Sequence, residues 1–290
     1  MAFAFFTLGG KQFWEDRFFY NGWRIQRSCL TGKYRLLDEW DIRRESGTLV
    51  HCQNAFLHFI EVYQLLRPKQ KAVFLLHGYG QSKDTFNKMT KQFEQAGFMP
   101  IAVNMPTLRV GFNALVEQID FLLKNLKDIQ EVNFVVYGFS GLVLRKVLAK
   151  SWGWRRKMKI GRIVAINVPN RGALWGQKLS RFPIISNFLG SAVQMYIPDL
   201  AANLPDFPKS IEIGVLTSWN PLIRTILKIM PRSLQRLLPE KKESFVDGAK
   251  EIFAVKFWGL NFCSSQKVIT YCINFINTGK FKSAQKIKKL

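Results

Sequence analysis

Short runs of consecutive apolar residues alternate with longer amphipathic segments through the middle of this chain. The run "AVFLL" at 72–76 precedes a glycine-containing loop, which is typical of a buried parallel strand. Segment 82–98 has apolar residues at helical spacing, Ser82 or Asp84 as a cap, and Gly97 as a terminator. The same pattern predicts strands at 99–106, 132–138, 161–172 and 211–218, and helices at 111–129 and 141–152. This alternation predicts a doubly wound, mostly parallel α/β sheet, whose sites lie beyond the carboxyl ends of its strands.

The ends of the chain are less regular than its middle. Residues 13 to about 60 alternate in short segments broken by Thr31-Gly32 and Ser46-Gly47, which predicts a β-hairpin or meander. We therefore expect a β-rich extension at 1–70, packed on a core domain at 71–290. Within that domain, 172–208 and 218–240 are apolar, basic and interrupted by proline, as in a helical cap-like insertion. His58, within "NAFLHFI", is interpreted as a core or packing residue.

The charge of the chain bears on its partners. Forty-three Lys and Arg against 20 Asp and Glu give +23, which favours anionic surfaces such as lipid headgroups or nucleic acid. General compositional bias explains the excess equally well, and no nucleic-acid-binding motif accompanies it, so no nucleic acid is expected. The basic, apolar segment 220–237 suits either an interfacial helix or a cap over the sheet. An anionic membrane surface is thus an alternative partner, which pelleting with anionic but not neutral vesicles would support.

Cysteine and targeting signals indicate the compartment. The four cysteines lack CxxC spacing and lie in apolar surroundings, so we expect reduced, mostly buried thiols and neither a metal site nor a cofactor. The N-terminal "MAFAFFTLGG" lacks a basic region and a cleavage site, and is not interpreted as a signal peptide. No run of about 18 uncharged apolar residues is present to predict a membrane span. The prediction is a cytoplasmic protein, with peripheral attachment to the inner membrane as the alternative. The sequence does not indicate its oligomeric state.

Several motifs, in order, resemble the α/β-hydrolase superfamily, most closely its bacterial lipase-like and esterase-like branch. They are "FLLHGYGQS", "VVYGFSGLVLRKVLA", "GRIVAINVPNRGA", "IEIGVLTSWNPLIRTIL" and "VITYCINFINTGKF", and the resemblance covers residues 73–281. It implies the α/β-hydrolase fold. Ester hydrolysis by such a protein would need a serine nucleophile, a histidine base, a carboxylate and two oxyanion donors, without a cofactor.

The oxyanion loop of the family corresponds to "HGYG". The resemblance implies that His77 and Gly78 shape this loop, and that the backbone N–H of Tyr79 is an oxyanion donor. The second donor would be the N–H of the residue after the nucleophile, here Phe139. An ordinary turn at the end of a strand explains the same glycines without catalysis.

The nucleophile can be placed in two ways on "YGFSGL". In the first, Ser140 is the nucleophile, but Leu142 then takes a normally small position and two residues must be deleted. The second has no gap: Gly138 takes the serine position, and Ser140 and Gly141 fall on two family glycines. That position normally holds a strained, positive φ costing about 1–3 kcal/mol, which glycine avoids. We prefer the second alignment.

The positions of the catalytic base and acid also favour a protein with an incomplete triad. The family places its histidine before the terminal helix, yet the three histidines of this chain all precede the turn and 254–275 contains none. The acid corresponds to Glu243, with Asp247 as the nearby alternative. A triad without nucleophile or base retains about 10³- to 10⁴-fold catalysis over water. We therefore expect a pseudoenzyme that binds an acyl or lipid-like ligand or a partner. The alternatives are an active carboxylic-ester hydrolase using Ser140 and a basic peripheral membrane protein.

Overall fold

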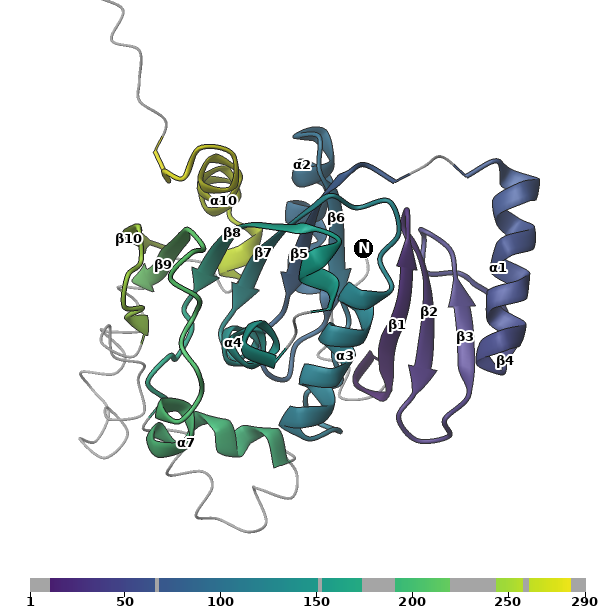
Figure 1. The fold of residues 1–290 in the computed structure, drawn as a ribbon, viewed down its shortest axis with the longest axis horizontal. Coiled ribbons are helices and arrows are strands. Elements are labelled where there is room, and N and C mark those ends of the chain that lie inside the picture. The colour runs from purple at the N-terminus through teal and green to yellow at the C-terminus, as the bar shows by residue number, and fades with distance from the viewer. Residues whose placement is uncertain are drawn as a thin grey trace, which may run out of the picture.

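The computed structural model contains two β-sheets side by side (Figure 1). It describes residues 11–65, 68–150, 153–173, 191–219, 244–257 and 261–282. One sheet is a four-stranded antiparallel meander near the N-terminus, in the order β1-β2-β3-β4. The other has six parallel strands in the order β10-β9-β8-β7-β5-β6.

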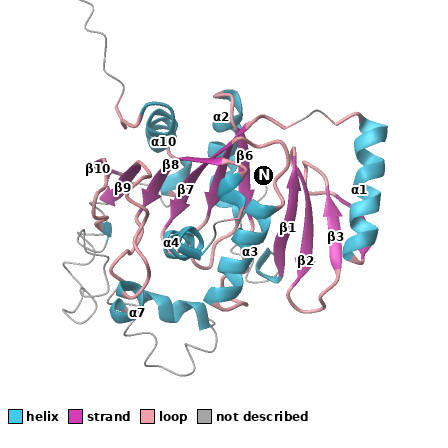
Figure 2. Ribbon diagram, viewed as in Figure 1, coloured by secondary structure: helices cyan, strands magenta, loops and turns pink. Residues whose placement is uncertain are grey.

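The parallel sheet carries helices on both faces (Figure 2). Its strands are β5 (Lys71–Leu76), β6 (Met99–Val103), β7 (Glu131–Tyr137), β8 (Lys159–Ile166), β9 (Ile213–Trp219) and β10 (Glu251–Lys256). Its helices are α2 (Asn87–Gln95), α3 (Phe112–Lys124), α4 (Ser140–Lys150) and α10 (Gln266–Thr278). Along β5, Phe74 packs into the core formed with α3 and α4, whereas Leu75 packs into the core formed with α2 and α10. Both faces are therefore buried, which explains the uninterrupted apolar runs in these strands.

The meander consists of β1 (Trp14–Tyr20), β2 (Trp23–Ser28), β3 (Tyr34–Leu37) and β4 (Arg43–Gly47), as the alternating pattern predicts. The sequence interpretation missed the helix that follows, α1 (Leu49–Tyr63). Thr48 caps it by accepting a hydrogen bond from the N–H of His51 at 3.1 Å, and Cys52 and Phe56 pack against the sheet. His58 lies on the exposed face of α1, so its interpretation as a core residue was wrong.

Hydrogen bonds join the meander to the parallel sheet just after β6. The N–H of Asn104 donates to the carboxylate of Asp16 on β1 at 2.8 Å, and its side-chain amide donates to the carbonyl of Trp14 at 2.7 Å. Gln118 on α3 donates to the carbonyl of Asp16 at 3.2 Å. The side chains of Asp16, Asn104 and Gln118 are all buried. The two sheets are thereby fixed at one end.

The predicted core strands and helices are all present, and the structure adds β10 as a sixth strand. The segments 174–190 and 220–243 lie outside the described residues, and with them nearly half of the first cap-like segment and nearly all of the second. The described part of the first contains a 3₁₀ helix, Ser191–Tyr196, and α7 (Pro198–Ala202). None of the described helices combines the length and apolarity needed to cross a membrane.

The cysteines are unpaired thiols, as expected. Cys52, Cys263 and Cys272 are buried, and Cys29 is half-buried. Cys263 and Cys272 both belong to the core between the sheet and α10. Burial raises the pKa of both thiols.

Candidate functional site at the turn between β7 and α4

Gly138 forms the turn between β7 and α4, at the carboxyl edge of the parallel sheet. Its φ is +58°, and its N–H donates to the carbonyl of Ile166 at the end of β8 at 2.8 Å. Among the described residues, the nearest atom to an ideal Cβ on Gly138 would be the Cα of Gly78, at 3.9 Å. The position therefore combines a left-handed backbone with room for a side chain.

Ser140 is the first residue of α4, and its side chain is fully buried. Its hydroxyl donates to the carbonyl of Leu76 at the end of β5 at 2.6 Å. It also accepts a hydrogen bond from the N–H of Tyr137 at 3.0 Å. The hydroxyl thus connects the carboxyl ends of two neighbouring strands, and it has no exposed surface from which to attack a substrate.

Gly141 has a packing role. An ideal Cβ at this position would lie 2.3 Å from Cγ1 of Val168, well inside contact distance. Val168 is itself buried in the loop after β8. Glycine therefore lets α4 begin close against that loop.

The predicted oxyanion loop follows β5 and faces this turn. His77 is fully buried; its Nδ1 donates to the carbonyl of Gly78 at 2.8 Å, and its Nε2 accepts from the N–H of Met105 at 3.0 Å. These partners require the neutral ring with the proton on Nδ1. Burial lowers the pKa of His77 to about 4. Because both ring nitrogens are occupied, His77 shapes the loop and is not positioned as a general base.

Two backbone donors adjoin the open position at Gly138. Within the described residues, neither the N–H of Tyr79 nor that of Phe139 donates a hydrogen bond. The loop is held by its other amides: Gly78 donates to the side chain of Gln81 at 3.0 Å, and Gly80 to the hydroxyl of Thr107 at 2.9 Å. Tyr79 and Phe139 are the residues in which the resemblance places the oxyanion donors.

An aromatic cluster borders the same turn. The Tyr79 and Phe139 rings lie 5.3 Å apart, and Tyr196 lies 5.9 Å from the first ring and 5.5 Å from the second. Phe112, at the start of α3, is 6.0 Å from Phe139. The hydroxyl of Tyr79 is buried without a hydrogen-bond partner among the described residues, and burial raises its pKa. The wall beside the turn is therefore largely apolar.

The structure brings no histidine base to this turn. His51 and His58 lie on α1, which packs on the meander at the far side from β7 and α4 (Figure 1). Glu243 lies outside the described residues. Asp247, the alternative acid, is exposed and pairs with Arg171 at 3.9 Å. Among the described residues no group of three or more His, Cys, Asp or Glu could hold a metal.

Arg145 on α4 has a role that the sequence interpretation missed. Its guanidinium is buried and donates to the carbonyls of Asn170, Leu204 and Pro205 at 2.7, 2.7 and 2.9 Å. Asn170 follows β8, and the other two follow α7. Arg145 therefore ties the helix behind the turn to two loops at the carboxyl edge.

The neutral state of His77 predicts acid sensitivity. Between pH 4 and about 6.5, the unfolded chain binds a proton at His77 and the folded chain does not. The free energy of unfolding therefore has its full value above this range and decreases as the pH falls through it. The expected loss is about 1.4 kcal/mol of unfolding free energy per pH unit. Urea titrations at pH 7.5 and 5.0 should show a smaller decrease for His77→Gln, whose amide can replace both hydrogen bonds. The exposed control His58→Gln should behave as the wild type; equal decreases in all three proteins would contradict the assignment.

Comparison with known proteins supports the fold. No protein-family model and no curated protein matches the chain. The mature lipase BlEst2 of Bacillus licheniformis superposes with a TM-score of 0.53 and 14% identity, over 73% of this chain and 91% of the lipase. Polyneuridine aldehyde esterase gives a TM-score of 0.47 and 12% identity, over 72% of this chain and 99% of the esterase. The monoacylglycerol lipase of Paleococcus ferrophilus gives 0.41 and 15%, over 65% and 85%. At 14% identity the likeness to the Bacillus lipase defines architecture alone, and with the six-stranded parallel sheet and its flanking helices it confirms that this chain has the α/β-hydrolase fold.

Proposed function

We propose that this protein binds an acyl or lipid-like ligand at the turn between β7 and α4 without hydrolysing it efficiently. The observation that carries the proposal is Gly138: it adopts the left-handed backbone of the turn, has room for a Cβ atom without a clash, and has no hydroxyl. The residue that has a hydroxyl, Ser140, uses it within the fold.

The alternative, an ester hydrolase using Ser140, is less well supported. Its hydroxyl would have to leave both the carbonyl of Leu76 and the N–H of Tyr137 before attacking a substrate. Each buried group left without a partner costs about 1–3 kcal/mol. None of the described histidines makes a hydrogen bond to the Ser140 hydroxyl. His77 is not free to accept its proton, because both of its ring nitrogens already have hydrogen-bond partners.

The surroundings of Gly138 support the ligand class. The unengaged N–H groups of Tyr79 and Phe139 could donate to one oxygen of a carboxylate or ester carbonyl. The first turn of α4 adds the favourable end of a helix dipole for a negative group. The half-buried ring of Tyr79, backed by the buried rings of Phe139 and Tyr196, could contact a hydrocarbon chain. A fatty acid combines both features.

A fluorophosphonate probe tests the absence of an active serine. We expect no labelling of the wild-type protein and no turnover of p-nitrophenyl esters above that of Ser140→Ala. Covalent labelling at Ser140 would overturn the proposal in favour of an active hydrolase.

Displacement of a dansylated fatty acid tests the binding site itself. Gly138→Asn should weaken its binding at least tenfold, because the new side chain fills the space before the two N–H groups, while asparagine tolerates a positive φ. Gly32→Asn is the matched control: Gly32 also has a positive φ, +70°, with nothing near its Cβ position, but it lies in the meander. Unchanged binding by Gly138→Asn, or equal loss in both variants, would contradict a site at this turn.

A further inference from the structure

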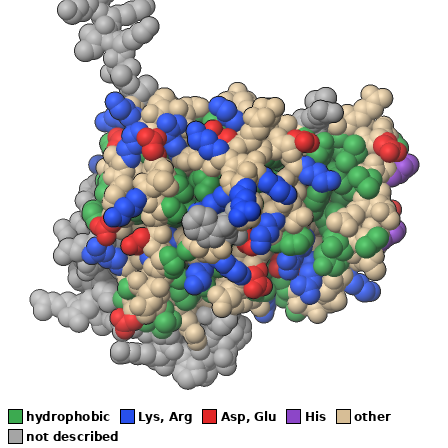
Figure 3. Space-filling view, in the orientation of Figure 1, with side chains coloured by type: hydrophobic (Ala, Val, Ile, Leu, Met, Phe, Trp, Pro, Cys, Tyr) green, Lys and Arg blue, Asp and Glu red, His purple; other side chains and the backbone are tan. Residues whose placement is uncertain are grey.

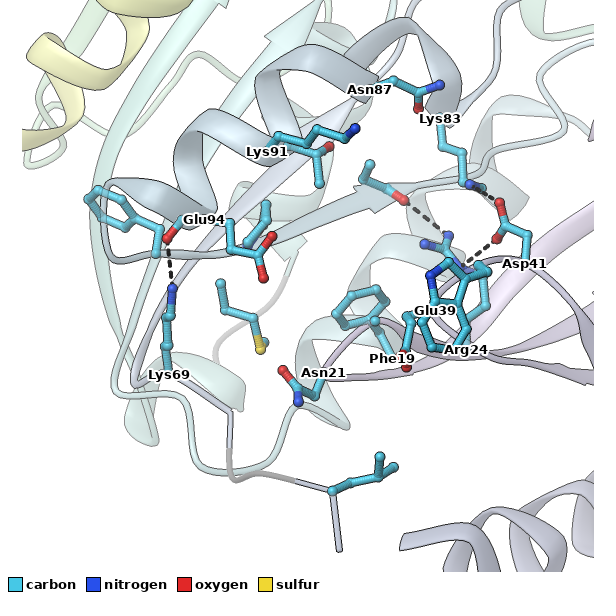
Figure 4. Close-up of a pocket in the computed structure, with 18 of the residues that line it drawn as sticks. Phe19, Asn21, Arg24, Glu39, Asp41, Lys69, Lys83, Asn87, Lys91 and Glu94 are labelled. Atoms are coloured by element: carbon cyan, nitrogen blue, oxygen red, sulfur yellow. Dashed lines mark hydrogen bonds and ion pairs between the residues drawn. The ribbon is translucent and has the colours of Figure 1, made fainter. Parts of the chain in front are cut away.

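A hollow lies between the two sheets, on the opposite side of β6 from β5. It has a volume of about 720 Å³ and is lined by β6, α2, the end of α1 and the turns of the meander. Figure 4 shows Lys69 and Glu94 at one end, Arg24, Asp41 and Lys83 at the other, and Phe19 between them. We call this hollow the intersheet groove. Its residues come from distant parts of the chain, and none belongs to the turn at Gly138.

The buried cation at one end of the groove has two ion-pair partners but lacks one hydrogen bond. Arg24 is 6% exposed; its Nη1 donates to the carboxylate of Asp16 at 3.0 Å and to the carbonyl of Ala102 at 3.2 Å. Its Nε is buried without a hydrogen bond, and the nearest carboxylate oxygen, on Asp41, is 3.6 Å away. The Nε and Nη2 edge is the one that arginine uses for bidentate binding of carboxylates. The Nε of Arg24 therefore has an ion-pair partner in Asp41 but no hydrogen bond, and a carboxylate that displaces Asp41 could accept one from it.

Further charges surround Arg24, and they compete with a ligand. Lys83 pairs with Asp41 and lies 3.7 Å from Asp84, which also pairs with Lys11. Burial, and next the charge of Arg24, lowers the pKa of Lys83. Asp41 is the carboxylate paired with the Nε of Arg24, and it lies on a turn with φ of +63°. A carboxylate of the ligand would have to replace Asp41 beside the Nε of Arg24.

The rim and floor of the groove favour a protein ligand. Trp40 and Tyr63 are 69% and 52% exposed at the rim, and tryptophan, tyrosine and arginine are the residues most often found as binding hot spots. Eight of the 21 lining residues are charged, whereas small-molecule pockets are lined mostly by apolar groups. Over the meander, hydrophobic side chains gather on the surface, and Lys and Arg are spread over the whole face (Figure 3).

The edge of β6 itself is closed to an added strand. Pro100 lines the groove and has no N–H to donate, and the carbonyl of Ala102 already accepts from Arg24. Recognition would therefore depend on side chains. We propose that the intersheet groove binds a peptide segment of a partner protein, whose acidic side chain displaces Asp41 from Arg24 and whose apolar side chain contacts Trp40 and Tyr63. This inference does not depend on the function proposed at Gly138.

An array of hexapeptides tests the groove. Each peptide carries one central Glu between apolar or aromatic residues, and a matched array replaces Glu with Gln. We expect binding to the Glu array with at least tenfold weaker binding to the Gln array. Trp40→Ala should weaken binding several-fold, since this exposed side chain contributes area without supporting the core. Ile252→Ala, at an exposed position on β10, is the matched control and should leave binding unchanged.

The most informative variant is Asp41→Asn. It removes the negative charge that competes with the ligand for Arg24, and asparagine also tolerates a positive φ. It should bind the Glu peptides several-fold more tightly, a gain that unfolding cannot mimic. No peptide bound, equal binding of the two arrays, or unchanged or weaker binding by Asp41→Asn would overturn the proposal. Tighter binding after removal of residues 1–10 would instead assign the groove to the chain's own N-terminal segment. Gly138→Asn should leave peptide binding unchanged, so failure at either site is distinguishable from failure at the other.

Discussion

Ser140→Ala is expected to lower the free energy of unfolding by about 2–4 kcal/mol. The substitution leaves the carbonyl of Leu76 and the N–H of Tyr137 without their shared partner, and both bonds lie in the interior beside β5 and β7. Each unsatisfied buried group costs about 1–3 kcal/mol. Urea denaturation followed by circular dichroism measures the difference directly.

A serine kept for catalysis would behave in the opposite way. Active-site positions are commonly strained, so replacing a catalytic residue often leaves stability unchanged or improves it. Ser264→Ala is the control: the Ser264 hydroxyl makes one hydrogen bond, to the carbonyl of Asn261 at 2.8 Å in an exposed turn. We expect a loss below about 1 kcal/mol there. A Ser140→Ala protein as stable as the wild type would contradict the structural role.

Arg145→Met is expected to destabilise the protein by about 3–5 kcal/mol, the usual effect of removing one partner from a buried charged network. The carbonyls of Asn170, Leu204 and Pro205 would lose their donor together. Arg145→Lys should recover part of this loss, because an ammonium group keeps the charge but lacks the planar fork that reaches three acceptors. The urea denaturation midpoints of the wild type, Arg145→Met and Arg145→Lys give the relative stabilities of the three proteins.

A local readout separates this role from general packing. The loop after α7 is held by two of the three bonds, so trypsin should cleave it faster in both Arg145 variants under native conditions. Lys150→Ala, at the exposed end of α4, should change neither stability nor cleavage, since the Lys150 ammonium lies 3.9 Å from Glu117 in an exposed pair. Unchanged cleavage in Arg145→Lys would show that the residue does not hold the loop.

The alternation of strands and helices could be predicted because both faces of the parallel sheet are buried, which makes its strands continuous apolar runs. Helix α1 was missed although the signal was present. Thr48 is a good cap, and Cys52, Phe56 and Tyr63 recur at helical spacing. They follow directly on a meander of short alternating segments, and that local context favoured a strand.

The turn at Gly138 illustrates what a local pattern can and cannot supply. A gap-free alignment placed glycine at the position whose φ is +58°, but the engagement of the Ser140 hydroxyl depends on Leu76, 64 residues away. The intersheet groove lay beyond prediction for the same reason: Arg24, Asp41 and Lys83 meet only after the two sheets pack. Whether Gly138 replaced a nucleophile, and whether Glu243 was its acid, remain predictions.

Two thiols at the contact between α10 and the sheet, one of them on α10 itself, report when this contact opens. Cys263 and Cys272 are fully buried, and their raised pKa values keep them as unreactive thiols in the closed state. A thiol reagent can reach them only when α10 separates from the sheet. The rate of alkylation of these two residues therefore measures how often the C-terminal helix detaches, in unmodified protein and without an added label.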